Sequence, residues 1–157
     1  MTIPPNTQLR DRLQGLWLPL VTPFRDGQID ETSLRRRPAH FRVLNGDDAQ
    51  YWDALTDGAD GAILLSAHVE TENFAAVRTL LREGDRETAR ARWDGISVLT
   101  KLLFAEPSPA PAKYWLSRAG LIDSPEVRLP MVEVSAELAG LLDEEIERRI
   151  PPLLRRA

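Results

Sequence analysis

The sequence predicts an α/β fold in which a small parallel sheet is followed by a long helical region. Two short apolar runs, 42–45 and 61–67, flank a segment with helical character. A strand–helix–strand unit of about 25 residues places its two strands side by side and parallel, with a right-handed crossover. From residue 69 onward, apolar residues recur at the spacing of amphipathic helices. The 157 residues are enough for one domain with its own core.

Composition excludes several classes of function. The chain has 20 basic and 24 acidic side chains and a net charge of −4, so it is not a generally basic nucleic-acid binder. It has no cysteine, which excludes disulfides and thiolate nucleophiles. Its two histidines, His40 and His68, are too few for a three-histidine metal site. We expect no metal and no cofactor. We also expect a soluble cytoplasmic protein, because no apolar run approaches the ~20 residues of a membrane span.

The amino-terminal part contains one candidate strand. Residues 1–13 are polar and contain prolines, which is typical of a loose lead-in. Residues 15–22 are almost continuously apolar and predict a strand buried on both faces of a parallel sheet. Pro19 argues against this strand, because a central strand has little room for a residue without an N–H group.

A turn and a helix should follow this strand. The Asp26-Gly27 pair predicts a turn over 24–28. Asp30 is a good N-cap for a helix that begins at Glu31. Pro38 falls where that helix should still be running and is expected to end it.

The next unit contains the clearest strand of the chain. Residues 42–45 predict a short strand, closed by the Gly-Asp-Asp sequence at 46–48. A helix is expected over 49–56 and a stop at the Asp-Gly pair at 57–58. The strand over 61–67 then completes the βαβ unit.

Four helices are expected in the remainder of the chain. The first ends at Gly84, the third has Pro111 in its first turn and ends at Gly120, and the last spans 135–149 with Ser135 as its cap. The apolar positions that define the four helices are, in order, Phe74, Val77, Leu80 and Leu81; Ala89, Trp93, Ile96, Leu99, Leu103 and Phe104; Tyr114, Trp115, Leu116 and Ala119; and Leu138, Leu141, Leu142 and Ile146. We expect Trp93, Trp115, Tyr114 and Phe104 to pack between the last helices.

Several of these segments together resemble the dihydrodipicolinate synthase and N-acetylneuraminate lyase family. Residues 18–30, LPLVTPFRDGQID, are similar to the first strand and loop of that family. Residues 45–48 and 56–69, NGDD and TDGADGAILLSAHV, are similar to its seventh and eighth strands. Residues 104–121 and 127–131, FAEPSPAPAKYWLSRAGL and VRLPM, are similar to its carboxyl-terminal helical region.

The resemblance implies a partial (β/α)8 barrel of the TIM type, made of strands one, seven and eight with a helical carboxyl-terminal region. A complete barrel needs about 250 residues. Only thirteen positions separate Ser33 from Gly46, so the resemblance implies that strands two to six are missing and that the chain is internally deleted relative to the family. The expected organisation is a lead-in over 1–13, one incomplete barrel with its helices over 14–150, and a tail over 151–157.

The same resemblance implies the chemistry of a pyruvate-dependent Schiff-base lyase or aldolase. In such enzymes an amine attacks a 2-keto acid, and the resulting imine is an electron sink for forming or breaking a carbon–carbon bond. The amine must be partly deprotonated, which needs desolvation or a cationic neighbour. The missing segment carries the family's imine-forming lysine, its proton-relay tyrosine and its carboxylate-binding loop. Lys101 and Lys113, the only lysines, fall on predicted helices and are expected to be solvated charges.

A residual part of the family's site is expected. Ile63 matches the branched residue that lies beside pyruvate, and Gly46 matches the glycine that ends the seventh strand. We predict these two as substrate-binding residues and no catalytic residue, although Ile63 can also be interpreted as ordinary core. Asp47 and Asp48 resemble paired acid–base carboxylates, but Asp48 is better interpreted as a helix N-cap. No metal or acid–base role is expected for His68, and arginines 35–37 are interpreted as a solvated helix face.

Three functional alternatives remain. The chain is an active lyase that condenses or cleaves 2-keto acids such as pyruvate, a non-catalytic chain that associates with itself or with a full-length relative, or a deletion product that folds poorly. The association hypothesis follows from the expected strand order 1-8-7. Strands one and seven would then have unpaired edges, which favour pairing with another chain.

Overall fold

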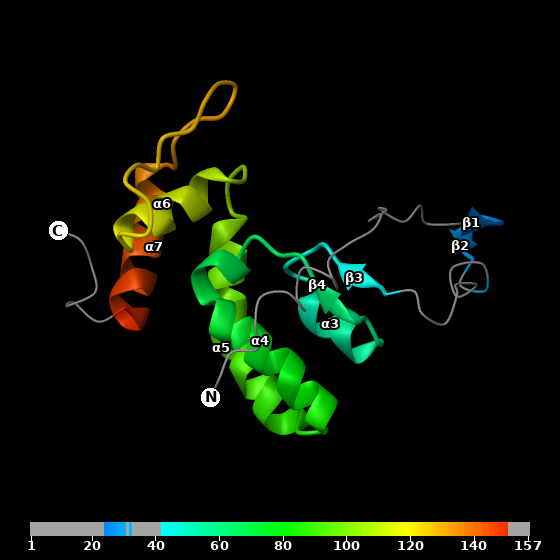
Figure 1. Ribbon diagram of the computed structural model, residues 1–157. Helices are drawn as coiled ribbons and strands as arrows, with labels where there is room; N and C mark the ends of the chain where they lie inside the picture. The colour runs from blue at the N-terminus through cyan, green and yellow to red at the C-terminus, as the bar shows by residue number, and fades with distance from the viewer. Residues whose placement is uncertain (1–23, 31, 33–41, 151–157) are drawn as a thin grey trace, which may run out of the picture. The chain divides into compact units, whose positions relative to one another are not determined.

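A computed structural model describes residues 24–30, 32 and 42–150 (Figure 1). The chain divides into two compact units, 1–41 and 42–157, each described here by itself. The predicted strand at 15–22, most of the helix expected from Glu31, His40 and the arginines at 35–37 lie outside the described residues. The lead-in over 1–13 and the tail over 151–157 do too, so the expected domain boundaries remain predictions.

The described part of the first unit is a β-hairpin. Strands β1 (Phe24–Arg25) and β2 (Gln28–Ile29) are antiparallel, with Phe24 opposite Ile29 and Arg25 opposite Gln28. Both residues between them have positive φ angles, 52° at Asp26 and 75° at Gly27. This is the two-residue turn that matches the twist of the flanking strands and favours an Asp-Gly pair. The predicted turn over 24–28 is therefore confirmed.

The second unit begins with the predicted βαβ arrangement. Strand β3 (Leu44–Asn45), helix α3 (Tyr51–Thr56) and strand β4 (Gly61–Ala62) follow one another, and the two strands are parallel with Leu44 opposite Gly61. The parallel pairing is confirmed, but both strands are shorter than expected. The second apolar run leaves the sheet after Ile63, whose N–H donates to the carbonyl of Asn45 at 2.9 Å. It continues as a loop to Ser66 and becomes helical at Ala67.

The four predicted helices are present in the described part of the chain. They are α4 (Ala67–Glu83), α5 (Arg86–Leu103), α6 (Ala110–Arg118) and α7 (Ala136–Arg149). Gly84 ends α4 with a φ of 87°, and Ser135 caps α7 by accepting the N–H of Leu138 at 3.1 Å. Pro111 lies in the first turn of α6. None of these helices is both long and apolar enough to cross a membrane.

An aromatic cluster joins α3, α4 and the first half of α5. Tyr51, Phe74 and Trp93 are buried with ring centroids 5.1 to 6.2 Å apart. The hydroxyl of Tyr51 donates to the backbone carbonyl of Phe74 at 2.7 Å. Trp93 was expected between the last helices, and this expectation is wrong. It lies early in α5, where its neighbours come from α3 and α4.

The environment of Tyr51 predicts a pH dependence of stability. Burial raises the pKa of Tyr51 from 10.0 to about 12, and the nearby cation of Arg78 opposes this rise. The folded chain keeps this proton between about pH 10 and about pH 12 whereas the unfolded chain releases it, so stability falls as pH rises through that range. Urea unfolding should show a steeper loss for the wild type than for Tyr51→Phe, by up to about 1.4 kcal/mol per pH unit. Equal slopes would contradict the assignment.

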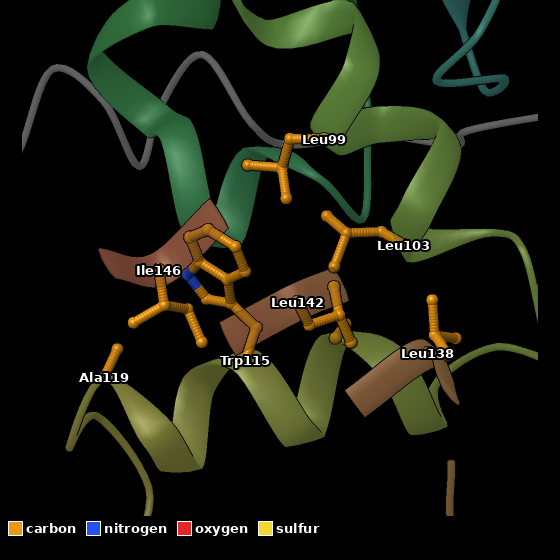
Figure 2. Packing of buried hydrophobic residues seen from close by; sticks show 8 residues of the cluster. Leu99, Leu103, Trp115, Ala119, Leu138, Leu142 and Ile146 are labelled. Atoms are coloured by element: carbon orange, nitrogen blue, oxygen red, sulfur yellow. The ribbon is translucent and has the colours of Figure 1, made fainter. Parts of the chain in front are cut away.

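A second cluster lies around Trp115, between α5, α6 and α7 (Figure 2). The Trp115 side chain is 1% exposed, and Figure 2 shows leucines from α5 and α7 around its indole ring. The buried members are Leu99, Leu103, Ala112, Trp115, Ala119, Leu138, Leu142 and Ile146.

Two predicted core positions near this cluster are exposed, so those predictions are wrong. Leu141 is 44% exposed because the buried stripe of α7 advances by four residues, from Leu138 to Leu142 to Ile146. Phe104 is 47% exposed. It is the C-cap of α5 with a φ of −120°. Its burial was predicted from the helical spacing of apolar residues, which no longer applies where the backbone is not helical.

Candidate functional site

The candidate site is formed by the carboxyl ends of β3 and β4. Gly46 follows β3 and Ile63 follows β4. The hydrogen bond from the Ile63 N–H to the Asn45 carbonyl holds the two strand ends together. Carboxyl ends of parallel strands are where α/β folds place their ligand-binding loops. The structure therefore brings the two predicted substrate-binding residues together at the carboxyl ends of the two strands.

Ile63 is 69% exposed, so its interpretation as ordinary core is wrong. Its neighbours Ala62 and Leu64 pack against the aromatic cluster of α3, α4 and α5. Because successive side chains of a strand point to opposite faces, Ile63 lies on the face that these helices do not cover. A Cβ atom at Gly46 would meet nothing within 4 Å. Both residues thus border open space within the described part of the chain.

Asp48 is buried and ties the two strand ends together. Its side chain accepts the N–H of Ser66 at 2.5 Å and that of Leu65 at 3.3 Å. These amides belong to the loop between β4 and α4, so the predicted role of Asp48 as N-cap of the following helix is wrong. The residue is 4% exposed. A buried carboxylate needs such donors, and the amides that precede α4 supply them.

Asp47 holds the turn that leads into α3, although the N-cap of that helix is Gln50 and no side chain caps it. Its carboxylate accepts the N–H groups of Ala49 at 2.9 Å and Gln50 at 3.3 Å, just before α3 begins. Asn45 supports this turn, since its side-chain oxygen accepts the N–H of Asp47 at 3.2 Å. The two carboxylates therefore bind separate sets of backbone amides. They do not form an acid–base pair.

The remaining candidate side chains lie outside this edge of the sheet. Lys101 is exposed in the last turn of α5. Lys113 lies in α6, and its ammonium donates to the backbone carbonyl of Glu126. His68 is exposed in the first turn of α4. In the part of the chain that the structure describes, no three histidine or acidic side chains are placed to hold a metal ion.

Comparison with known proteins identifies a family. The model of the Dihydrodipicolinate synthetase family matches residues 31–148. The 4-hydroxy-tetrahydrodipicolinate synthase 2 of Clostridium acetobutylicum is 40% identical over 120 residues, which are 75% of this chain and 42% of that protein. The 4-hydroxy-tetrahydrodipicolinate synthase of Hyphomonas neptunium is 36% identical over 132 residues, covering 80% of this chain and 45% of that protein.

Solved structures of similar proteins agree. The dihydrodipicolinate synthase of Aquifex aeolicus superposes with a TM-score of 0.68 and 30% identity, over 73% of this chain and 39% of that one. The chloride-inhibited enzyme of Acinetobacter baumannii, described as complexed with pyruvate, superposes with a TM-score of 0.62 and 29% identity, over 68% and 36%. These likenesses confirm the predicted fold class, an α/β chain that forms part of a (β/α)8 barrel with a helical carboxyl-terminal region. The chain spans about two fifths of the length of the relatives it matches.

Proposed function

Because the chain belongs to the dihydrodipicolinate synthetase family, we propose that it supplies one wall of a pyruvate-dependent lyase site and does not catalyse alone. The observation that carries this proposal is Ile63. A branched apolar side chain at the carboxyl end of a strand is 69% exposed, on a sheet face that the described helices leave uncovered. Such a side chain gains stability when another surface covers it.

The ligand that we propose for this wall is pyruvate or a related 2-keto acid. Pyruvate is named as the ligand of the similar Acinetobacter baumannii enzyme. We propose that Ile63 contacts the apolar part of the keto acid and that Gly46 lets the backbone approach it. Both remain binding residues only, since neither carries a group that forms or breaks a bond.

The catalytic amine is what this chain does not provide. Imine formation needs an amine that is partly deprotonated at neutral pH, and enzymes achieve this by desolvation or by a cationic neighbour. Lys101 is exposed on α5, and Lys113 already donates to a backbone carbonyl. We propose that the family's imine-forming lysine and proton-relay tyrosine belong to strands that are missing between Ser33 and Gly46.

Association with another chain would complete the wall. Within the described residues, β3 and β4 pair only with each other. In the expected strand order 1-8-7, β3 corresponds to strand seven, and its outer edge would be open to a strand of another chain. We propose that the partner is a chain of the same family, either a second copy or a full-length relative, and that the assembly acts in the cytoplasm.

Trapping of the imine tests the proposal directly. The chain alone, incubated with pyruvate and borohydride, should keep its intact mass, because neither lysine is set up to form the imine. The full-length Clostridium acetobutylicum relative, treated in the same way, serves as the positive control. A stable pyruvyl adduct on Lys101 or Lys113 would overturn the proposal.

Sedimentation of the same samples tests the association. We expect the chain to sediment as an oligomer, or together with the full-length relative when the two are mixed. Ile63→Asp should weaken this association without unfolding the chain, because a partner that completes the wall would cover the Ile63 side chain, which is 69% exposed in the single chain. Leu129→Asp is the matched control, since Leu129 is 89% exposed in the loop between α6 and α7. A monomer in both experiments would exclude the association.

A further inference from the structure

Helix α4, which follows Ile63 in the chain, is interrupted at Glu70. Glu70 has φ and ψ angles of −138° and 39°, outside the helical range. Sharp helix kinks usually arise at proline, at glycine or serine pairs, or where a side chain intrudes into the backbone ladder. The first turns of α4, residues 67–73, read AHVETEN and contain neither proline nor glycine. The cause of the interruption must therefore lie in the contacts of the segment.

The carboxylate of Glu70 is held by two donors from different elements. Its Oε1 accepts the Nη1 of Arg149 at 2.9 Å, although the two residues are 79 positions apart. Its Oε2 accepts the side-chain amide of Asn73 at 2.7 Å. The pair is largely shielded from water, with side-chain exposures of 18% for Arg149 and 13% for Glu70. Shielded pairs of this kind are screened much less than surface pairs.

Arg149 uses its whole guanidinium group to join three helices. Besides Glu70 on α4, it donates its Nε to Glu145 on α7 at 2.9 Å. Its Nη2 donates to the backbone carbonyl of Gly95 on α5 at 2.6 Å. Glu145 is itself 4% exposed, so this carboxylate needs the cation beside it. The planar fork of arginine suits three acceptors at fixed positions, and lysine cannot reproduce it.

The short segment between β4 and the interruption is held at both ends. Asp48 binds the N–H groups of Leu65 and Ser66 at its start, and Arg149 binds Glu70 at its end. Across the interruption, the hydroxyl of Thr71 donates to the carbonyl of Ala67 at 2.5 Å. Such back-bonding bends a helix and does not by itself hold it in place.

We propose that Arg149 is a positioning residue that holds α4 interrupted at Glu70 and thereby orders the segment behind Ile63. The last turn of α7 is then coupled to the wall of the candidate site through one guanidinium group. The effect on a ligand at that wall rests on the proposed function, but the ordering of the segment does not.

Hydrogen exchange on the free chain tests this proposal without a ligand or partner. In Arg149→Gln the amides of residues 67–73 should exchange about ten-fold faster than in the wild type, while those of α6 keep their rates, because local opening has its own free energy. Arg148→Gln is the matched control. Arg148 carries the same charge on the same turn and pairs with Glu145 at 2.9 Å, but it is 68% exposed and should leave residues 67–73 unchanged.

Glu70→Gln tests the same contact from the other helix and covers the case in which Arg149→Gln does not fold. It should accelerate exchange over the same residues, because a neutral amide gives up the charge-assisted bond to Arg149. Unchanged exchange at 67–73, or an equal acceleration across all helices, would overturn the proposal. Neither result bears on imine formation or association, so the failure of one proposal can be told from the failure of the other.

Discussion

Replacing Trp115 with alanine should lower the free energy of unfolding by about 3–5 kcal/mol, the range for large aromatic side chains removed from a core. The indole is 1% exposed and lies at the centre of the cluster that joins α5, α6 and α7 (Figure 2). Its removal leaves a cavity that α5, α6 and α7 can close only by moving toward one another, which their remaining contacts resist. Urea unfolding followed by circular dichroism measures the loss.

Phe104→Ala is the matched control for this substitution. It also removes an aromatic ring from the same part of the chain, but Phe104 is 47% exposed, so we expect less than about 1 kcal/mol. If the two variants lost similar stability, the Trp115 cluster would not be the core of the helical region. A far larger loss at Trp115 would show that α6 and α7 depend on this one side chain.

The helical region could be predicted from the sequence because its signals are local. Gly84 and Ser135 both end or begin helices as expected. Leu138, Leu142 and Ile146 are buried, because residues spaced four apart lie on the same face of a helix. The burial of Leu141 was predicted wrongly because two adjacent leucines cannot both lie on a narrow buried stripe. Composition alone does not say which of the two is buried.

The candidate site could be predicted only in part, because its contacts join distant parts of the chain. The resemblance to the family selected Gly46 and Ile63, and the predicted parallel pairing of their strands is consistent with their placement at neighbouring strand ends. The exposure of Ile63, however, depends on which strands pair beside it. Asp48 lies 18 residues from the amide it binds, and Arg149 lies 79 residues from Glu70. Charged residues on amphipathic helices are typical of solvated faces, so nothing in the local pattern distinguishes Arg149 from Arg148.

Replacing Asp48 with alanine should cost about 2–4 kcal/mol of unfolding free energy, because one buried and one partly buried amide lose a charged acceptor. These amides, of Leu65 and Ser66, are part of the turn that leads from β4 into α4. Asp48→Asn keeps an acceptor oxygen in place and should recover part of the loss. Thermal and urea unfolding of the two variants give the comparison.

Asp47→Ala is the matched control, because it removes the neighbouring carboxylate without removing the acceptor of the Leu65 and Ser66 amides. Asp47 also accepts two backbone amides, those of Ala49 and Gln50, but at an exposed position before a six-residue helix. Water can replace the carboxylate there, so we expect a loss of about 0.5–1 kcal/mol, the net contribution of an ordinary hydrogen bond. Equal losses for the two alanine variants would mean that Asp48 acts only as a local cap. A larger loss of stability for Asp48→Ala than for Asp47→Ala is expected if Asp48 joins the ends of β3 and β4. This link keeps Gly46 and Ile63 at one site.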